Sequence, residues 1–318
     1  MAHELTIRKN GKAEMAYVGT KPWHGLGQEL VAGADLETWK ESSGMDWDIL
    51  SGPVKFNSDG TFPQYNVLYR SDDHEPLSIV SSKYKVVQPG EVLEFFKDLV
   101  GANGFELTTA GTLFGGKRFW ALASIGQEAC VVGKDKVGGY LLLSSSCDGT
   151  LATTARFTTV RVVCNNTLSM AINDQKAEVT VGHRSHFNPT TVKDQLGIAK
   201  DAFADFMKEA RLLSKIKLSE VEAGAFVDSL LVDTKTIYKE DATQSRQYKK
   251  ILELFNGQGI GADLSGAKGT AWGLVNAVTE YVDHHARAKT DSARLASAWF
   301  GRGDSLKTEA AQRLLAAV

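Results

Sequence analysis

The chain has 318 residues, of which 43% are hydrophobic and 23% are charged, and these ordinary globular proportions exclude global disorder. Its 36 basic and 38 acidic side chains nearly cancel, so net charge does not indicate a polyanion partner and any basic surface has to be a local patch. The N-terminus is polar, and no apolar run approaches the ~20 residues of a membrane helix. We therefore expect no signal peptide, no membrane partner and a cytoplasmic location.

The first third of the chain predicts one short helix followed by β structure. Asp35 is a typical N-cap for a helix that runs through Trp39 and ends at Gly44. Residues 49–56 and 65–70 have the composition of strands and flank an Asp-Gly pair, which is a hairpin signal. Two further short strands are expected over residues 77–81 and 84–87.

The middle third predicts a helix, a β-meander and a second helix. Pro89-Gly90 opens an amphipathic segment over residues 91–100, and Pro is favourable at a helix start because its missing N–H has no partner there. Gly-Gly and Asp-Gly turns then separate the strand candidates. Asn and Thr are good N-caps, so residues 165–167 are expected to start a helix over residues 168–174. The strand candidates cover residues 105–112, 118–125, 139–145 and 152–163.

The last third predicts helices. Asn188-Pro189-Thr190 starts a helix whose apolar residues, from Val192 to Leu213, recur in steps of four and three. We therefore predict an α+β fold, with an antiparallel β-meander and flanking helices in a β-rich domain over residues 1–188. A helical domain or extension over residues 189–318 is expected to pack on it. Its further helices are expected over residues 221–231, 244–255, 270–288, 292–300 and 305–317.

The sequence contains no recognisable catalytic, nucleotide or metal pattern. Residues 256–261 resemble a dinucleotide fingerprint, but a predicted helix rather than a strand precedes them, so we expect a loop there. His183 and His186 lack the cysteines or the second pair of a structural zinc site. The three cysteines show no CxxC spacing and are expected to be buried, reduced thiols. We expect no cofactor, and an enzyme only if an unfamiliar site exists near Arg161 and Asn165.

Basic and aromatic residues are mixed in the meander, and this mixture suggests a nucleic-acid partner. Cations track phosphates while rings stack on bases, which is how proteins hold single strands. We expect a cationic groove in which Arg156 lies with Lys117 or Arg118. Side chains alternate along a strand, so Arg161 should point to the opposite face from Arg156 and be a buried structural arginine. The candidate nucleic-acid-binding residues are Lys117, Arg118, Trp120, Arg156 and Phe157.

Three motifs together resemble one known family, the phage/plasmid-like family of the domain of unknown function 932. The resemblance runs from Trp23 to about Leu306, and it implies a protein of phages, plasmids and related mobile elements in a bacterial host cell. The motif residues are expected to be structural or functional: Arg161 could pair with a buried acid, and Asn165 could cap the following helix. The motifs are Trp23-His24-Gly25-Leu26-Gly27, Asp148-Gly149 with Arg161-Val162-Val163-Cys164-Asn165-Asn166-Thr167-Leu168, and Ala271-Trp272-Gly273 through Thr279-Glu280-Tyr281-Val282-Asp283-His284.

The predicted order of elements is also similar to the core of the Rad52-like and RecT-like single-strand annealing proteins, which is an analogy of topology only. We therefore expect non-catalytic binding of single-stranded DNA or RNA, by a homo-oligomeric ring or filament in phage or plasmid recombination. One alternative is a mobile-element effector that binds and inhibits a host or competitor protein. A second alternative is an enzyme. The family-motif residues to locate are Trp23, His24, Arg161, Asn165, Asn166 and Trp272.

Overall fold

The computed structural model describes residues 6–8, 11–19, 27–57, 60–103, 105–163, 166–169, 171–172, 175–197, 202–233 and 245–317. The fold is α+β, as predicted, and its centre is one large sheet with the strand order β10-β9-β8-β7-β6-β1-β2. Neighbouring strands are antiparallel except β1 and β2, and β13 pairs with the same edge of β9 as β10 does. The strands are β1 (Met15–Val18), β2 (Gln28–Leu30), β6 (Glu106–Leu113), β7 (Arg118–Cys130), β8 (Lys136–Ser146), β9 (Thr153–Arg161), β10 (Asn166–Ser169) and β13 (Glu178–Val181).

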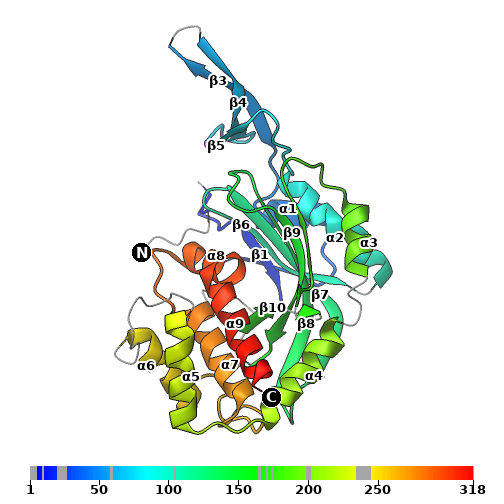
Figure 1. Cartoon of the computed structure of the whole chain (residues 1–318). Coiled ribbons are helices and arrows are strands. Elements are labelled where there is room, and N and C mark those ends of the chain that lie inside the picture. The colour runs from blue at the N-terminus through cyan, green and yellow to red at the C-terminus, as the bar shows by residue number, and fades with distance from the viewer. Residues whose placement is uncertain are drawn as a thin grey trace.

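Helices cover both faces of this sheet (Figure 1). On one face Leu141 and Phe157 belong to a hydrophobic cluster with Phe95 and Phe96 of α2. On the other face Trp120 and its neighbours pack against the C-terminal helices. The helices are α1 (Leu36–Ser43), α2 (Pro89–Asn103), α3 (Pro189–Gly197), α4 (Ala202–Lys215), α5 (Glu220–Asp233), α6 (Arg246–Glu253), α7 (Ala271–Glu280), α8 (Asp291–Phe300) and α9 (Arg302–Ala316).

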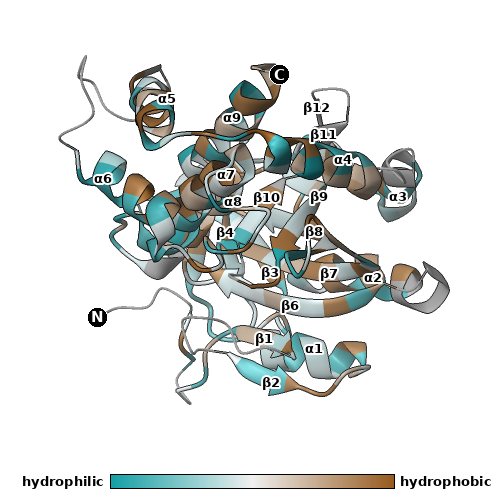
Figure 2. Ribbon diagram, turned by 90° about the horizontal axis from the view of Figure 1, so that it is seen from below, coloured by the Kyte–Doolittle hydropathy of each residue, from teal (hydrophilic) through white to brown (hydrophobic). Residues whose placement is uncertain are grey.

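The hydrophobic core continues across residue 188. One cluster contains Ala155 and Phe157 from β9, Phe206 from α4 and Leu274 from α7. Figure 2 shows hydrophobic residues along β7 and β8 and on α4 and α7, which lie next to the sheet. The helical C-terminal part is therefore packed on the β-rich part, although its description as a separate domain stays a prediction.

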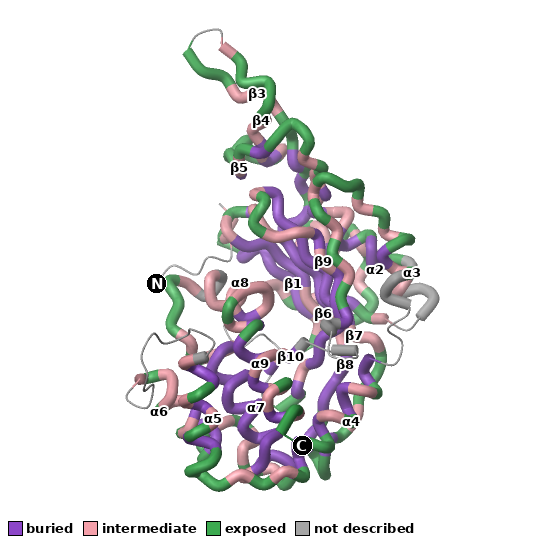
Figure 3. The backbone as a smooth tube through the Cα atoms, viewed as in Figure 1, coloured by how far each residue is buried: buried purple, intermediate pink, exposed green. Residues whose placement is uncertain are grey.

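A three-stranded sheet projects from this body as an arm (Figure 1). It consists of β3 (Ile49–Phe56), β4 (Gly60–Arg70) and β5 (Pro76–Ser81), in the order β3-β4-β5. Residues near its root, such as Ile49 and Leu68, are buried, whereas most of β3 and of the outer half of β4 is exposed (Figure 3). The arm therefore contributes little to the core and presents most of its surface to solvent.

The predicted hairpins and helix ends are largely confirmed. The Asp35 carboxylate accepts the Thr38 backbone N–H at the start of α1, and Gly44, with φ of 76°, ends that helix. Such a left-handed conformation favours glycine because it lacks a Cβ atom. The long helix predicted from residue 189 appears as α3 and α4, and the residues between them lie outside the described ranges.

Two predictions of secondary structure are wrong, and so is the expected burial of Cys130, which is exposed. Residues 84–87 form no strand, and the helix predicted over residues 168–174 is replaced by β10 and by β11 (Ala171–Ile172). The open edge of β9 explains the second difference, because it offers backbone partners to β10 and because the Thr158 and Thr159 hydroxyls both donate to the Leu168 carbonyl. Tertiary pairing overrides the local capping signal there.

Candidate nucleic-acid interface

Two of the quoted motifs meet at a buried carboxylate. Arg161, at the end of β9, binds Asp135 in the β7–β8 turn with both arms of its guanidinium group: Nε lies 2.6 Å from Oδ1 and Nη2 lies 3.0 Å from Oδ2. The indole Nε1 of Trp272 donates to the same Oδ2 at 2.9 Å. All three residues are buried. The predicted pairing of Arg161 with a buried acid is confirmed, and its structural role stays a prediction.

Arg161 also holds the glycine-rich loop that follows the π-helical turn η1 (Leu254–Gln258). Its Nη1 and Nη2 donate to the carbonyls of Ile260 and Gly261, at 3.4 and 3.0 Å. The Glu280 carboxylate accepts the Ile260 backbone N–H at 3.0 Å, and burial raises the pKa of Glu280 above its ordinary value. Residues 259–261 form a loop, as predicted, and both a cation and a carboxylate bind it, whereas residues 256–258, which were predicted to belong to the same loop, lie in η1.

The next motif residues connect β10 to the C-terminal helices. The Asn166 side chain donates to the Asn276 carbonyl of α7 at 3.2 Å. The Thr167 N–H and hydroxyl donate to Asp283 at 2.7 and 3.0 Å, and Lys307 of α9 binds Asp283 at 2.8 Å. We call the residues Asp135, Arg161, Asn166, Thr167, Trp272, Glu280, Asp283 and Lys307 the motif cluster.

The geometry favours a structural role for the motif cluster. Arg161 has its donors directed to Asp135 and to backbone carbonyls, which leaves it buried and already paired. An enzyme site around Arg161 would require these bonds to be exchanged for substrate. Three motif residues, Trp23, His24 and Asn165, lie outside the described residues, so their predicted roles stay predictions. Sequence reasoning missed Asp135, because a Gly-Lys-Asp-Lys turn is typical of an exposed hairpin.

The predicted cationic groove on the sheet is wrong for three of its five residues. Trp120, Arg156 and Phe157 are buried, because helices cover both sheet faces. Arg156 binds Asp304 at 3.0 Å and donates to the Trp299 carbonyl, on the α8–α9 side. Arg156 and Arg161 point to opposite faces of the sheet, as predicted, because Arg156 binds Asp304 of α9 whereas Arg161 binds Asp135 in the β7–β8 turn. Replacing Arg156 is now expected to lower stability rather than nucleic-acid affinity.

Lys117 and Arg118, the other two groove residues, are partly exposed at a different place, where four segments meet. The meeting point is the β8–β9 turn, residues 146–151. The Tyr84 hydroxyl donates to the Ser146 carbonyl at 2.8 Å, and His183 Nε2 lies 2.8 Å from the Leu151 carbonyl. Arg118 Nη2 donates to Thr150 Oγ1 at 2.9 Å. These contacts bring residues 82–86, 114–118 and 182–186 to one turn.

The four segments at this turn are strongly basic. They carry five Lys or Arg residues and one acid, Asp148, whose carboxylate accepts the Thr150 N–H at 3.0 Å. Three of the cations are exposed and two are partly exposed. Among the residues that the structure describes, none of the five forms an ion pair. We call this surface the basic junction, and its residues are Lys83, Lys85, Lys117, Arg118 and Arg184.

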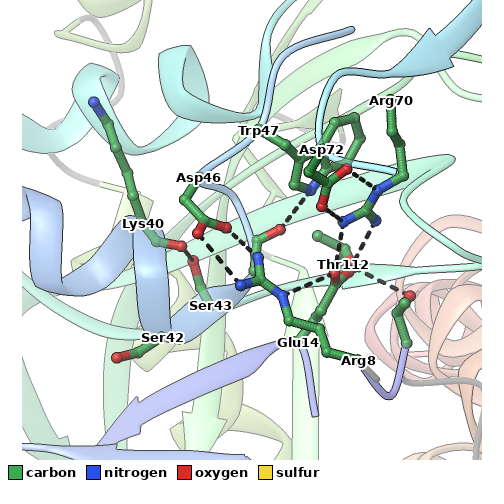
Figure 4. Close-up of polar contacts among 12 residues, drawn as sticks. Arg8, Glu14, Lys40, Ser42, Ser43, Asp46, Trp47, Arg70, Asp72 and Thr112 are labelled. Carbon is green, nitrogen blue, oxygen red and sulfur yellow. Dashed lines mark hydrogen bonds and ion pairs between the residues drawn. The ribbon is translucent and has the colours of Figure 1, made fainter. Parts of the chain in front are cut away.

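The arm next to the basic junction is anchored by a buried ion pair (Figure 4). Arg70, at the root of β4, binds Glu14 at 2.8 Å and Asp72 at 2.8 Å, and its guanidinium carbon lies 4.1 Å from the Trp47 ring centroid. The Thr112 hydroxyl also contacts Glu14. Because Glu14 and Arg70 are both buried, this contact fixes the arm on the body.

Comparison with known proteins adds a family but no activity. No helix in the described ranges is long and apolar enough to span a bilayer, and no group of three or more His, Cys, Asp or Glu side chains there could hold a metal ion. No curated protein and no solved structure matches the chain significantly. The family model described as "Domain of unknown function (DUF932)" matches residues 76–299, well over half of the chain. The chain therefore belongs to the DUF932 family.

Proposed function

We propose that this protein binds single-stranded nucleic acid through its phosphates at the basic junction. The observation that carries the proposal is the meeting of five cations, from three separate segments, with one acid, in a chain whose net charge is −2. Lys and Arg side chains bind nucleic acid by neutralising phosphates and releasing the counterions condensed on them. A local patch of this kind can bind a polyanion although the whole chain cannot attract one by its net charge.

The local backbone directs the cations away from the protein. Tyr84 turns its ring inward, where it stacks on His183 with ring centroids 4.4 Å apart and bonds the β8–β9 turn. Lys83 lies in a turn closed by the Tyr84 N–H, which donates to the Ser81 carbonyl at 2.9 Å, and the Lys85 N–H donates to the His183 carbonyl at 2.6 Å. Both lysines are exposed, and so is Arg184, which follows His183. Tyr84 and His183 thus pack against each other, while the cations next to them in the sequence remain exposed to solvent.

The biological setting of the proposal comes from the resemblance of the motifs. That resemblance implies a phage or plasmid protein in the cytoplasm of a bacterial host, and the analogy of topology with single-strand annealing proteins supports a homo-oligomer that anneals single strands in recombination. The alternative, an effector that binds a host protein, requires no affinity for nucleic acid. The two functions are therefore separated by the same binding experiment.

The proposal is tested by the salt dependence of binding. We would measure the anisotropy of a fluorescent oligothymidine at several salt concentrations for the wild type and for the K83A/K85A/R184A variant. Each lost phosphate contact should reduce the slope of log K against log salt by about 0.7, so three should reduce it by about 2. The matched control is K215A/K217A/K268A, which removes three exposed lysines elsewhere and should keep the wild-type slope. A wild type without affinity at low salt would overturn the proposal in favour of the effector.

A further inference from the structure

The arm has an outer face that is apolar and uncovered. In the β3–β4 register Leu50 lies opposite Tyr69, and Val54 lies opposite Phe62, so these side chains share one face of the sheet. The other face carries Leu68 and Val80, which are buried against the body. The exposed members of the outer face include Leu50 (39% exposed), Phe56 (52%), Phe62 (46%), Tyr65 (44%) and Ile79 (63%).

Three of these exposed residues are aromatic and form a row. The ring centroids of Phe56 and Phe62 are 6.3 Å apart, and those of Phe62 and Tyr65 are 5.4 Å apart. Aromatic rings contribute large apolar areas and are normally covered in a folded protein. An uncovered row of this kind marks a surface that binds a partner. We call Phe56, Phe62 and Tyr65 the aromatic row.

The cations of the neighbouring basic junction favour a polyanion as the partner of the aromatic row. The strands β3, β4 and β5 contain no acidic residue, and their two cations lie away from the row: Lys55, paired with Thr61, points to the opposite face, and Arg70 is buried in ion pairs. Of the three acids between β4 and β5, two are engaged at the root, where Arg70 binds Asp72 at 2.8 Å and lies 3.7 Å from Asp73, and the third, Glu75, is exposed. Carboxylates on these strands would repel a phosphate backbone, so their absence permits a nucleic-acid partner, and the five cations of the basic junction supply the attraction for one.

The aromatic row is continuous with the basic junction. Tyr65 is paired with Ser81 across the β4–β5 ladder, and the Ser82 N–H donates to the Gln64 carbonyl at 2.9 Å. Lys83 is the next residue, so the first cation of the junction begins beside the last ring of the row. A nucleic-acid strand with its phosphates on the junction would therefore have bases within reach of the arm.

We infer that the aromatic row stacks on unpaired bases of the nucleic acid bound at the basic junction, and thereby selects single strands over duplex. This inference rests on the proposed function and deepens it. Aromatic side chains stack on any base, because every base has a π-face, but a duplex keeps its bases stacked on one another. The buried pair of Arg70 and Glu14 holds the arm at a fixed position relative to the junction.

The test compares single-stranded and duplex affinity for the F62L/Y65L variant, which keeps the arm apolar but removes two rings. Affinity for an oligothymidine should fall by at least about tenfold, while duplex affinity and the salt slope should stay at the wild-type values. Quenching of 2-aminopurine placed in the single strand should fall with the affinity, since it reports stacking directly. The matched control is I79A, which removes an exposed aliphatic side chain from the same face and should bind like the wild type.

The outcomes separate the inference from the proposed function. If F62L/Y65L binds single strands like the wild type while K83A/K85A/R184A binds them weakly, the phosphate contacts are real and the stacking inference is wrong. If I79A and F62L/Y65L both dissociate an oligomer in gel filtration without a change in single-strand affinity, the face binds a second copy instead, and the inference is again overturned. Circular dichroism of each variant verifies that the exposed substitutions leave the fold intact.

Discussion

The motif cluster and the basic junction with its arm differ in every property that decides a function. In the motif cluster Asp135, Arg161 and Trp272 are buried and bonded to one another, so their polar groups are already satisfied. At the junction Lys83 and Lys85 are exposed, and the nearby arm presents uncovered rings. Residues that a motif makes recognisable therefore maintain the fold here, whereas the available surface is built from residues that no motif marks.

The family match separates most of the arm from both the motif cluster and the basic junction. It covers residues 76–299, which include all five cations of the basic junction. They also include every member of the motif cluster except Lys307. It leaves out β3 and β4, which form most of the arm. The aromatic row therefore lies outside the matched region.

The largest decrease in unfolding free energy is expected when the Asp135 carboxylate, which joins two motifs, is removed. Asp135→Ala leaves the Arg161 guanidinium buried without its partner, and breaking a buried pair in this way costs about 3–5 kcal/mol of unfolding free energy. Urea unfolding followed by fluorescence measures the change. Asp263→Ala, at an exposed acid, is the control and should stay within about 0.5 kcal/mol of the wild type. A loss of less than about 1 kcal/mol in D135A would contradict the structural role.

Breaking the buried ion pair of Lys307 and Asp283 should lower the unfolding free energy by a somewhat smaller amount. Lys307→Met removes the cation beside Asp283, but the carboxylate keeps the N–H and the hydroxyl of Thr167 as donors. We expect a loss of about 2–3 kcal/mol, near the low end for a broken buried pair. The same urea titration measures it. Stability equal to that of the wild type would mean that α9 does not depend on this contact.

Glu280 gives the motif cluster a dependence on pH. Burial raises its pKa, so the folded state keeps the carboxyl proton at pH values where the unfolded state, with a pKa near 4.5, has released it. The stabilisation by this group is fully present below that value and is lost as the pH rises through the folded pKa. Glu280→Gln should flatten the fall in unfolding free energy just above pH 4.5. An unchanged pH profile in E280Q would exclude this group as the cause.

The smallest effect on stability is expected on the arm. Phe62→Leu changes a side chain that is 46% exposed, so its unfolding free energy should stay within about 0.5 kcal/mol of the wild type. This near-neutral result sharpens the comparison, because the same ring is proposed to matter for binding. A loss above about 2 kcal/mol would show that the aromatic row is a packed part of the core.

The local elements could be predicted from the sequence, because turns and caps are short-range signals. The Asp35 cap and the Gly-Gly turn before β7 are examples. The alternation of side chains also predicted that Arg156 and Arg161 face opposite sides of the sheet. It could not tell that both sides are covered, because α2 and α8 reach the sheet through tertiary packing. The groove assigned to Trp120 and Arg156 failed for that reason.

The basic junction could not be predicted for a related reason. Tyr84 and Ser146 are 62 positions apart, and His183 and Leu151 are 32 apart, so only the folded chain brings their neighbours together. Lys117 and Arg118 were found because the meander was recognised, whereas Lys83, Lys85 and Arg184 carry no local signal. The partner of Arg161 was predicted as a buried acid, but Asp135 could not be selected among many acids.

The most direct test of the central claim compares one variant from each region in one binding assay. The salt dependence of oligothymidine binding would be measured for the wild type, for K83A/K85A/R184A and for W272F, which removes the indole donor from Asp135. We predict that the junction variant loses about 2 units of salt slope and that W272F, measured below its unfolding temperature, keeps the wild-type slope. A folded W272F protein that no longer binds, beside a junction variant that binds like the wild type, would place the function in the motif cluster and contradict the account.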